Sequence, residues 1–417
     1  MLNFIIVYIF QIVSSKILKI PFSIPEINKS ENYLKNLFHS NIITTIKIGT
    51  PEQTFLSTIK LSEIESYILS NEIKTDISPL FNKEQSSSYK GLKKEYFNLQ
   101  DIDNGIMSID NLIIKDSNNE NLKINNYSFA LALEISSSKL GEIKYPSCLG
   151  LEISLFTNNF IPQLYINKLI DSHSFTFEFN KNKGYLIIGE KTFGEKGFVS
   201  KKTGKINEDI IWSFNFNSVE SGDKKIFHVN NAIIKNEIDL IIGPNEYLDY
   251  LWDNYFKKKA CKKEFFYILS MQYDYFVCES NVDVKDFPVL KFIEKQLNFS
   301  FEFDYLDLFD DFEGKKYFKI IYPDIKSKIW VLGRVFLKKY KLYFDSERKT
   351  IGIFINTDSE SHALTYVIII LIIIIIILIV ERLISYAKNP RRKKAYELDD
   401  GYDYIFNKNN NTETKLI

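Results

Sequence analysis

Charged side chains occupy a polar loop between two apolar runs in the second half of the chain. Residues 232–234 lead to Lys235, and the polar segment that follows contains Glu237 and Asp239. A second apolar run then ends at Gly243-Pro244. This pattern predicts a buried strand, a tight loop, a second strand and a turn. Charge in such a loop is costly to bury unless an opposite charge compensates it. The available chemistry is that of one amine and two carboxylates.

The same arrangement occurs near the N-terminus. A Gly-Thr-Pro turn at residues 49–51 precedes an apolar run that ends at Lys60. A polar segment with Glu63 and Glu65 follows, and residues 66–69 lead into a further apolar stretch. The repetition predicts two related strand–loop units, each with a lysine where the strand ends.

Both units resemble the active-site loops of the pepsin-like aspartic proteases (peptidase A1). In that family an Ile-Gly-Thr-Pro turn precedes the first Asp-Thr-Gly loop, and the second loop ends in Leu-Leu-x-Gly-Pro. A third match is Trp-Val-Leu-Gly-Arg-Val-Phe-Leu-Lys-Lys-Tyr at residues 330–340, which resembles the family's Trp-Ile-Leu-Gly-Asp-x-Phe-Leu-Arg-x-Tyr. The resemblance implies an all-β, bilobal fold with a few short helices and a groove for an extended peptide.

The sequence departs from the family at the residues that carry its chemistry. Lys60-Leu61-Ser62 stands where the family has its first Asp-Thr-Gly, and Lys235-Asn236-Glu237 stands where it has the second. An aspartic protease needs two carboxylates that share a proton, with pKa values split by their environments. A charged ammonium cannot deprotonate water. The sequence therefore predicts a homologue without endopeptidase activity whose ectodomain binds or scaffolds a peptide or protein.

The alternative is an active endopeptidase that uses substitute carboxylates, of which Glu63, Glu237 and Asp239 are the candidates. Each lies two to four residues along a tight loop, whereas catalysis tolerates a misplacement of only about 1 Å before large losses. The two lysines have two expected environments. Lys60 pairs with Glu63 or Glu65 and Lys235 pairs with Asp239, or the amines stay open and select acidic ligands.

The flap that covers the substrate in active relatives is also altered. Its Tyr and two glycines fall at about Asn98, Leu99 and Asp101, beside Phe97. A flap without glycine loses the positive φ angles that shape its turn. Together with the loops, Phe97 and Asn98 are expected to line the ligand-binding cleft.

Composition limits the partners. The formal net charge is zero and the body has no basic stripe interleaved with aromatic residues, which argues against nucleic acid. Three cysteines and four histidines show no metal-ligand spacing, so no metal and no cofactor is expected.

Two apolar segments predict passage through the secretory pathway and a membrane. Residues 1–15 fit a signal peptide cleaved near Ser15. Residues 363–380 are uncharged and would span roughly 27 Å as a helix. The cluster Arg391–Lys394 follows, and positive charge marks the cytosolic side. We expect a single-pass protein of the secretory pathway or cell surface, with a lumenal or extracellular body.

The tail contains Tyr402-Asp-Tyr-Ile405, with the spacing of a signal for a sorting adaptor.

The remaining chain divides accordingly. Residues 16–37 form a short pro-like lead, in which residues 17–22 resemble the first strand of the family's pro-segment. An N-terminal β lobe covers 38–200 and a C-terminal β lobe 204–357. Residues 363–380 are the membrane helix and 381–417 the cytosolic tail. Whether a shortened cleft-plugging pro-segment survives in the lead stays open.

Two kinds of covalent modification are expected. The resemblance implies a disulfide between Cys261 and Cys278 in the second lobe, which a secretory context permits. Asn28, Asn126 and Asn298 each begin an Asn-x-Ser sequon.

Overall fold

The computed structural model describes residues 16–26, 32–97, 102–141, 143–153, 159–190, 192, 195–206, 209–222, 224–227, 230–355 and 378–384. The chain forms two compact units, residues 1–355 and 356–417. In the second unit, residues 378–384 are helical. No helix among the described residues is long and apolar enough to cross a bilayer. The predicted signal peptide, the first fifteen residues of the predicted span at 363–380, and Tyr402 lie outside the described residues.

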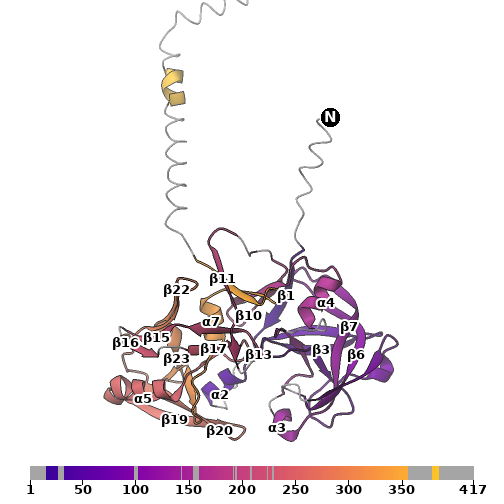
Figure 1. Ribbon diagram of the computed structural model, residues 1–417, viewed down its shortest axis with the longest axis horizontal. Helices are drawn as coiled ribbons and strands as arrows, with labels where there is room; N and C mark the ends of the chain where they lie inside the picture. Colours follow the sequence, from indigo (N-terminus) through magenta and orange to yellow (C-terminus); the bar gives the residue numbers. More distant parts are fainter. Residues whose placement is uncertain are drawn as a thin grey trace, which may run out of the picture. The chain divides into compact units, whose positions relative to one another are not determined.

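One thirteen-stranded sheet carries the first lobe and joins it to the second (Figure 1). The final hairpin of the second lobe, β27–β28, pairs with β9 of the first lobe. This hairpin therefore ties the end of the second lobe to the first. The strands in order are β11 (Phe198–Lys202), β28 (Thr350–Phe354), β27 (Leu342–Asp345), β9 (Ser174–Asn180), β10 (Lys183–Ile188), β1 (Leu18–Ser23), β2 (Ile43–Ile48), β3 (Gln53–Lys60), β8 (Ser147–Gly150), β4 (Tyr67–Leu69), β7 (Asn121–Glu134), β6 (Asn104–Lys115) and β5 (Lys90–Phe97).

The second lobe contains a nine-stranded sheet and a four-stranded sheet. The first comprises β14 (Ser213–Phe216), β17 (Asn230–Ile234), β26 (Trp330–Leu332), β18 (Ile241–Ile242), β25 (Ile320–Pro323), β20 (Met271–Glu279), β24 (Lys315–Phe318) and β23 (Phe309–Phe312), with β19 (Cys261–Ile268) beside β20. The second comprises β16 (Lys224–Phe227), β15 (Ser218–Ser221), β21 (Leu290–Glu294) and β22 (Phe299–Phe303). A short pair, β12 (Lys205–Ile206) and β13 (Asp209–Ile210), lies at the start of the second lobe in sequence.

The described helices are short, as the resemblance implied. Those of the first unit are α2 (Tyr33–Phe38), η1 (Lys83–Gln85), α3 (Ser137–Leu140), α4 (Phe160–Ile166), α5 (Asn245–Asn254), η2 (Phe256–Lys258), α6 (Tyr305–Leu308) and α7 (Arg334–Lys339). The α5 helix buries Tyr247, Leu248 and Leu251 on one side, which is the three- and four-residue spacing of an amphipathic helix.

The lead segment is built into both lobes. The β1 strand pairs with β10 over its whole length, from Leu18 opposite Ile188 to Ser23 opposite Lys183. The α2 helix then packs on the second lobe, where Tyr33 and Leu34 join a buried cluster with β19, β20 and β25. Only residues 24–32 connect these two elements.

Aromatic packing at the junction of the lobes sets the position of the two loops. Trp212, which is fully buried, packs edge-on against Phe175 of β9 and Phe344 of β27. Its indole N–H donates to the carbonyl of Leu151, just after β8. The backbone behind the first loop is therefore fixed directly against the second lobe.

Candidate functional site

Each predicted loop begins at the end of a strand, opposite a glycine on or just after the neighbouring parallel strand. Lys60, the last residue of β3, pairs in parallel register with Gly150 of β8. In the second lobe Ile234 of β17 pairs with Leu332 of β26, so Lys235 and Gly333 come next. A Cβ atom on Gly150 would lie 2.5 Å from the carbonyl oxygen of Glu63. One on Gly333 would lie 2.2 Å from that of Leu240. Both loops therefore require glycine on the neighbouring strand.

Asn236 joins the two loops directly. The backbone N–H of Leu61 donates to Asn236 Oδ1 over 2.8 Å, and Asn236 Nδ2 donates to the carbonyl of Ile59, also over 2.8 Å. Both Leu61 and Asn236 are fully buried. One amide thus satisfies a donor and an acceptor that would otherwise be buried and unpaired.

Glu237 makes a second contact between the lobes. Its Oε1 accepts from the backbone N–H of Ser62, at 3.2 Å, and from the Ser62 hydroxyl. Its Oε2 is buried and has no hydrogen-bond partner within the described part of the chain. The predicted substitute carboxylate is therefore tethered through one oxygen to the opposite lobe.

Asp239 does not pair with Lys235, which corrects one of the expected environments. Its carboxylate instead forms ion pairs with Lys338 and, at 3.6 Å, with Arg334. Burial alone would raise the pKa of Asp239, but these two cations outweigh burial and lower it. The expectation failed because α7 brings cations that lie about a hundred residues further along the chain.

Arg334 stands where the family's Trp-Ile-Leu-Gly-Asp segment has its Asp. Its side chain is fully buried, and it donates to the carbonyl of Asn236 over 2.8 Å. It also donates to the carbonyl and the hydroxyl of Ser40, just after α2. Burial lowers the pKa of Arg334, but a guanidinium stays charged at any physiological pH. This one cation fastens the second loop to Ser40, at the start of the first lobe.

Glu152 is a site residue that the sequence analysis missed. It follows β8 by two residues and is 7% exposed. Its Oε1 accepts from the backbone N–H groups of Ile153, at 2.9 Å, and Trp212, at 3.2 Å. Burial raises its pKa to about 8, with a further upward contribution from Glu237 and a downward one from Lys235. No motif marks this position; its role follows from the contact with Trp212 across the lobe junction.

The two lysines are both only partly buried. The Lys235 amine makes no ion pair with any described residue, although its charge acts on Glu152. Glu63 and Glu65 are 2% and 5% exposed, and the Glu63 carbonyl accepts from the Glu152 backbone N–H at 2.9 Å. The first loop is therefore fixed to the segment after β8 by a backbone hydrogen bond.

The other predicted features are only partly covered. Asn98 and Asp101 lie outside the described residues, as does Asn28, and the side chain of Phe97 is not described. Asn126 and Asn298 are exposed. Among the described residues, no three His, Cys, Asp or Glu side chains gather as a metal site would require.

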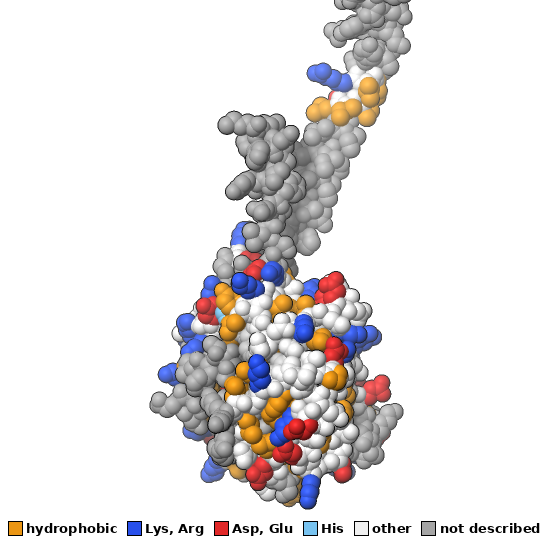
Figure 2. Space-filling model, turned by 90° about the vertical axis from the view of Figure 1, so that its right-hand side faces the viewer, with side chains coloured by type: hydrophobic (Ala, Val, Ile, Leu, Met, Phe, Trp, Pro, Cys, Tyr) orange, Lys and Arg blue, Asp and Glu red, His pale blue; other side chains and the backbone are white. Residues whose placement is uncertain are grey.

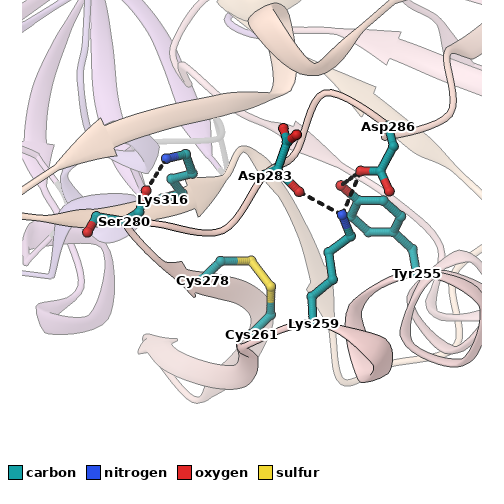
Figure 3. Close-up of a disulfide and its surroundings, with 8 residues drawn as sticks. All are labelled: Tyr255, Lys259, Cys261, Cys278, Ser280, Asp283, Asp286 and Lys316. Carbon is teal, nitrogen blue, oxygen red and sulfur yellow. Dashed lines mark hydrogen bonds and ion pairs between the residues drawn. A yellow bond between two sulfur atoms is a disulfide. The ribbon is translucent and has the colours of Figure 1, made fainter.

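The predicted disulfide is confirmed (Figure 3). Cys261 and Cys278 are opposite each other in β19 and β20 and are joined by an S–S bond. Cys148 is free and buried. The bridge closes the base of a long hairpin, and loop closure of this length contributes about 3 kcal/mol in a chain-entropy estimate.

Comparison with known proteins agrees with this architecture. The family model for eukaryotic aspartyl proteases matches residues 41–354. Plasmepsin IV of Plasmodium falciparum is 26% identical over 193 residues, and this holds for the protein from each of two isolates. The aligned part is 45% of this chain and 39% of each plasmepsin, so it spans well under two thirds of these relatives. The match along both lobes places this chain in the eukaryotic aspartyl protease family.

Proposed function

We propose that this chain is an aspartic protease homologue without endopeptidase activity, whose ectodomain binds an extended peptide or protein segment. The observation that carries the proposal is the pair of strand ends at the lobe junction. Each ends in a lysine, and Asn236 fills the space between the loops with hydrogen bonds to the opposite backbone. Two ammonium groups cannot share a proton and activate water as a carboxylate pair does.

Two of the candidate substitute carboxylates are engaged in contacts that hold the fold together. Glu237 is bound through Oε1 to Ser62, and Asp239 is neutralised by two cations. A general base must lie within hydrogen-bonding reach of the attacking water in a productive pose. Carboxylates committed to lobe contacts are poorly suited to that role.

A second candidate function is endopeptidase activity through Glu152 and Glu237. The favouring observation is the pKa of Glu152, raised to about 8 with a contribution from Glu237. A buried carboxyl whose pKa is raised in this way can act as a general acid near neutral pH. Against it, the Glu152 Oε1 atom already accepts two backbone N–H groups.

A cleavage assay decides between these functions. The full-length chain is incubated from pH 3 to pH 8 with a peptide library, next to Lys60→Asp/Lys235→Asp and Glu152→Gln. We expect no cleavage by any of them, because the loop threonine and glycine of the active family are also absent. Cleavage by the wild type that Glu152→Gln abolishes would establish the second candidate. Turnover by the double Asp variant would show that the scaffold retains a catalytic geometry.

The ligand class follows from the charge at the loop. Lys235 has no ion pair with any described residue, so we propose that it favours an acidic peptide. Binding of a fluorescent Asp-rich peptide to the full-length chain should weaken in Lys235→Met and lose part of its salt dependence. An unchanged affinity and salt response in that variant would remove Lys235 from the binding site.

We also propose that the chain is anchored by residues 363–380, with its body on the lumenal or extracellular side and its tail in the cytosol. Resistance to alkaline carbonate extraction and protection of the body from added protease in sealed vesicles test this topology. Glycosidase-sensitive mass at Asn126 and Asn298 would support it independently. Changed localisation of Tyr402→Ala would support the sorting signal in the tail, and unchanged localisation would exclude it.

A further inference from the structure

One long strand of the second lobe has an open edge. The β19 strand pairs with β20 from Cys261 opposite Cys278 to Ile268 opposite Met271. It pairs with no other described strand, so its second edge lies at the margin of the sheet. No described residue outside β20 bonds to the backbone of residues 262–268. Such a row of unpaired N–H and C=O groups is a template for an added strand.

The outer face of the same strand is apolar and exposed. Phe265 and Tyr267 alternate along it and are 56% and 52% exposed, and Leu269, in the turn that follows the strand, is 61% exposed. The rings of Phe265 and Tyr267 contact each other edge to face, with centroids 5.6 Å apart. The alternate residues Phe266 and Ile268 point inward and pack in the cluster that also holds α2. The exposed residues therefore belong to a strand whose register is fixed by its buried side.

The start of the strand carries positive charge. Lys257 and Lys258 end η2, and Lys262 and Lys263 begin β19. All four are exposed. Lys263 pairs with Asp274 at 3.0 Å, and Lys257 lies 3.9 Å from Asp253. Lys258 and Lys262 have no ion pair among the described residues. The edge thus has a basic end and an apolar end.

The base of this hairpin is cross-linked and hydrogen-bonded (Figure 3). The disulfide joins its two strands at the first pair. Beside it, the Lys259 amine donates to the carbonyl of Asp283 and pairs with Asp286, each at 2.6 Å, and Tyr255 donates to the same Asp286 carboxylate. A preformed edge loses little conformational freedom when a strand is added.

We propose that the open edge of β19 is a docking site for an extended peptide segment of another protein. The segment would lie antiparallel to β19, with alternating apolar side chains against Phe265 and Tyr267. Acidic residues at its C-terminal end would meet Lys262 and its neighbours. Backbone hydrogen bonds supply affinity in this mode of binding, and side chains on one face supply specificity.

Two other occupants fit the observations less well. A lipid surface offers no partners for the open backbone groups, and unpaired strand edges are not tolerated in hydrocarbon. A second copy of the chain would bring another basic end and no exposed acidic counterpart on β19. An acidic, extended segment matches both the hydrogen-bonding edge and the charge.

The test uses the full-length chain and a fluorescein-labelled peptide, Val-Thr-Val-Thr-Val-Asp-Asp. We expect saturable binding by anisotropy and slower amide exchange at residues 262–268, the sign of strand addition. Phe265→Lys should weaken binding about tenfold or more, because a charge on an open edge opposes pairing. Lys262→Glu/Lys263→Glu should weaken it and reduce its salt dependence. Matched controls are Leu306→Lys, at an apolar site 70% exposed on α6, and Lys326→Glu, at an exposed lysine.

Four results would overturn the proposal. In one, the peptide does not bind, or an analogue with alternate N-methylated amides binds equally well. In another, the peptide-free chain forms a dimer in analytical ultracentrifugation that Phe265→Lys dissociates, and the edge is then a self-association site. In the third, the chain binds phosphatidylserine vesicles through the same residues. Anisotropy that falls in Lys235→Met but not in Phe265→Lys would place the peptide in the cleft and overturn the edge site, whereas slower amide exchange at residues 262–268 reports on this edge alone.

Discussion

The two loops at the lobe junction share a frame and differ in what fills it. Each starts with a lysine at a strand end, next to a glycine on the parallel neighbour strand. The second loop contributes the side chains of Asn236 and Glu237 to the hydrogen bonds across the junction. Their partners in the first lobe are backbone groups and the Ser62 hydroxyl. The contact is one-sided because Leu61, the counterpart of Asn236, has no polar atom in its side chain. The two loops therefore share the same backbone arrangement, but most of the side chains that hydrogen-bond across the junction come from the second loop.

The residues that follow the two glycines differ in the same way. Leu151 follows Gly150 and is an ordinary core residue, 1% exposed. Arg334 follows Gly333 and links Asp239, Asn236 and Ser40. The buried cation of the junction therefore lies in the second lobe, whereas the first lobe contributes the buried carboxyls of Glu63, Glu65 and Glu152. Away from the junction, charges of both signs are scattered over the face of the first lobe that Figure 2 shows.

The largest expected effect is at Arg334. Arg334→Met leaves Asp239 with one exposed lysine and removes the hydrogen bonds that the guanidinium donates to Ser40. Breaking a buried ion pair from one side costs about 3–5 kcal/mol. Leu151→Met at the mirror position should cost less than about 1.5 kcal/mol, because it conserves volume. Urea unfolding of the full-length chain measures both. Equal losses in the free energy of unfolding would show that the Arg334 contacts stabilise the fold no more than ordinary core packing at Leu151 does.

A smaller loss is expected at Asn236. Asn236→Ala leaves the N–H of Leu61 and the carbonyl of Ile59 buried without partners, at about 1–3 kcal/mol for such a group. Asn236→Asp keeps an acceptor for Leu61 but loses the donor to Ile59, so it should fall between Ala and the wild type near neutral pH. A free energy of unfolding unchanged by Asn236→Ala would mean that water replaces the bridge.

The sequence predicted the course of the backbone at the site, but it did not predict which side chains contact one another there. It predicted both strand–loop frames, because apolar patterning fixes them locally, and the family resemblance implied the disulfide. It placed Lys60 and Lys235 correctly at the strand ends. It did not predict that Asp239 would pair with α7, or that Glu152 would be buried under Trp212. Those contacts join residues far apart in sequence, and no periodicity reports them.

The pH dependence of stability should depend on Glu152. Its folded pKa of about 8 lies above the ordinary value of 4.5, so between these pH values the folded chain holds a proton that the unfolded chain releases. Stability should therefore fall as the pH rises through this window, by up to about 1.4 kcal/mol per pH unit, and level off above it. Glu152→Gln should remove this component from urea unfolding measured at stepped pH. An identical pH profile in the variant would place the titration elsewhere.

The smallest expected effect tests whether the two lysines are equivalent. Lys235 lowers the pKa of Glu152 by attracting its carboxylate, so Lys235→Met should raise that pKa. The fall in stability with pH would then continue beyond pH 8. The change is expected to stay below about 1 kcal/mol, because the amine is partly solvated and screened. Lys60→Met should shift the profile less, and Lys326→Met, at a remote exposed lysine, not at all. Equal shifts in Lys60→Met and Lys235→Met would show that both loops present their amines to the same carboxyl, and the junction would be electrostatically symmetric after all.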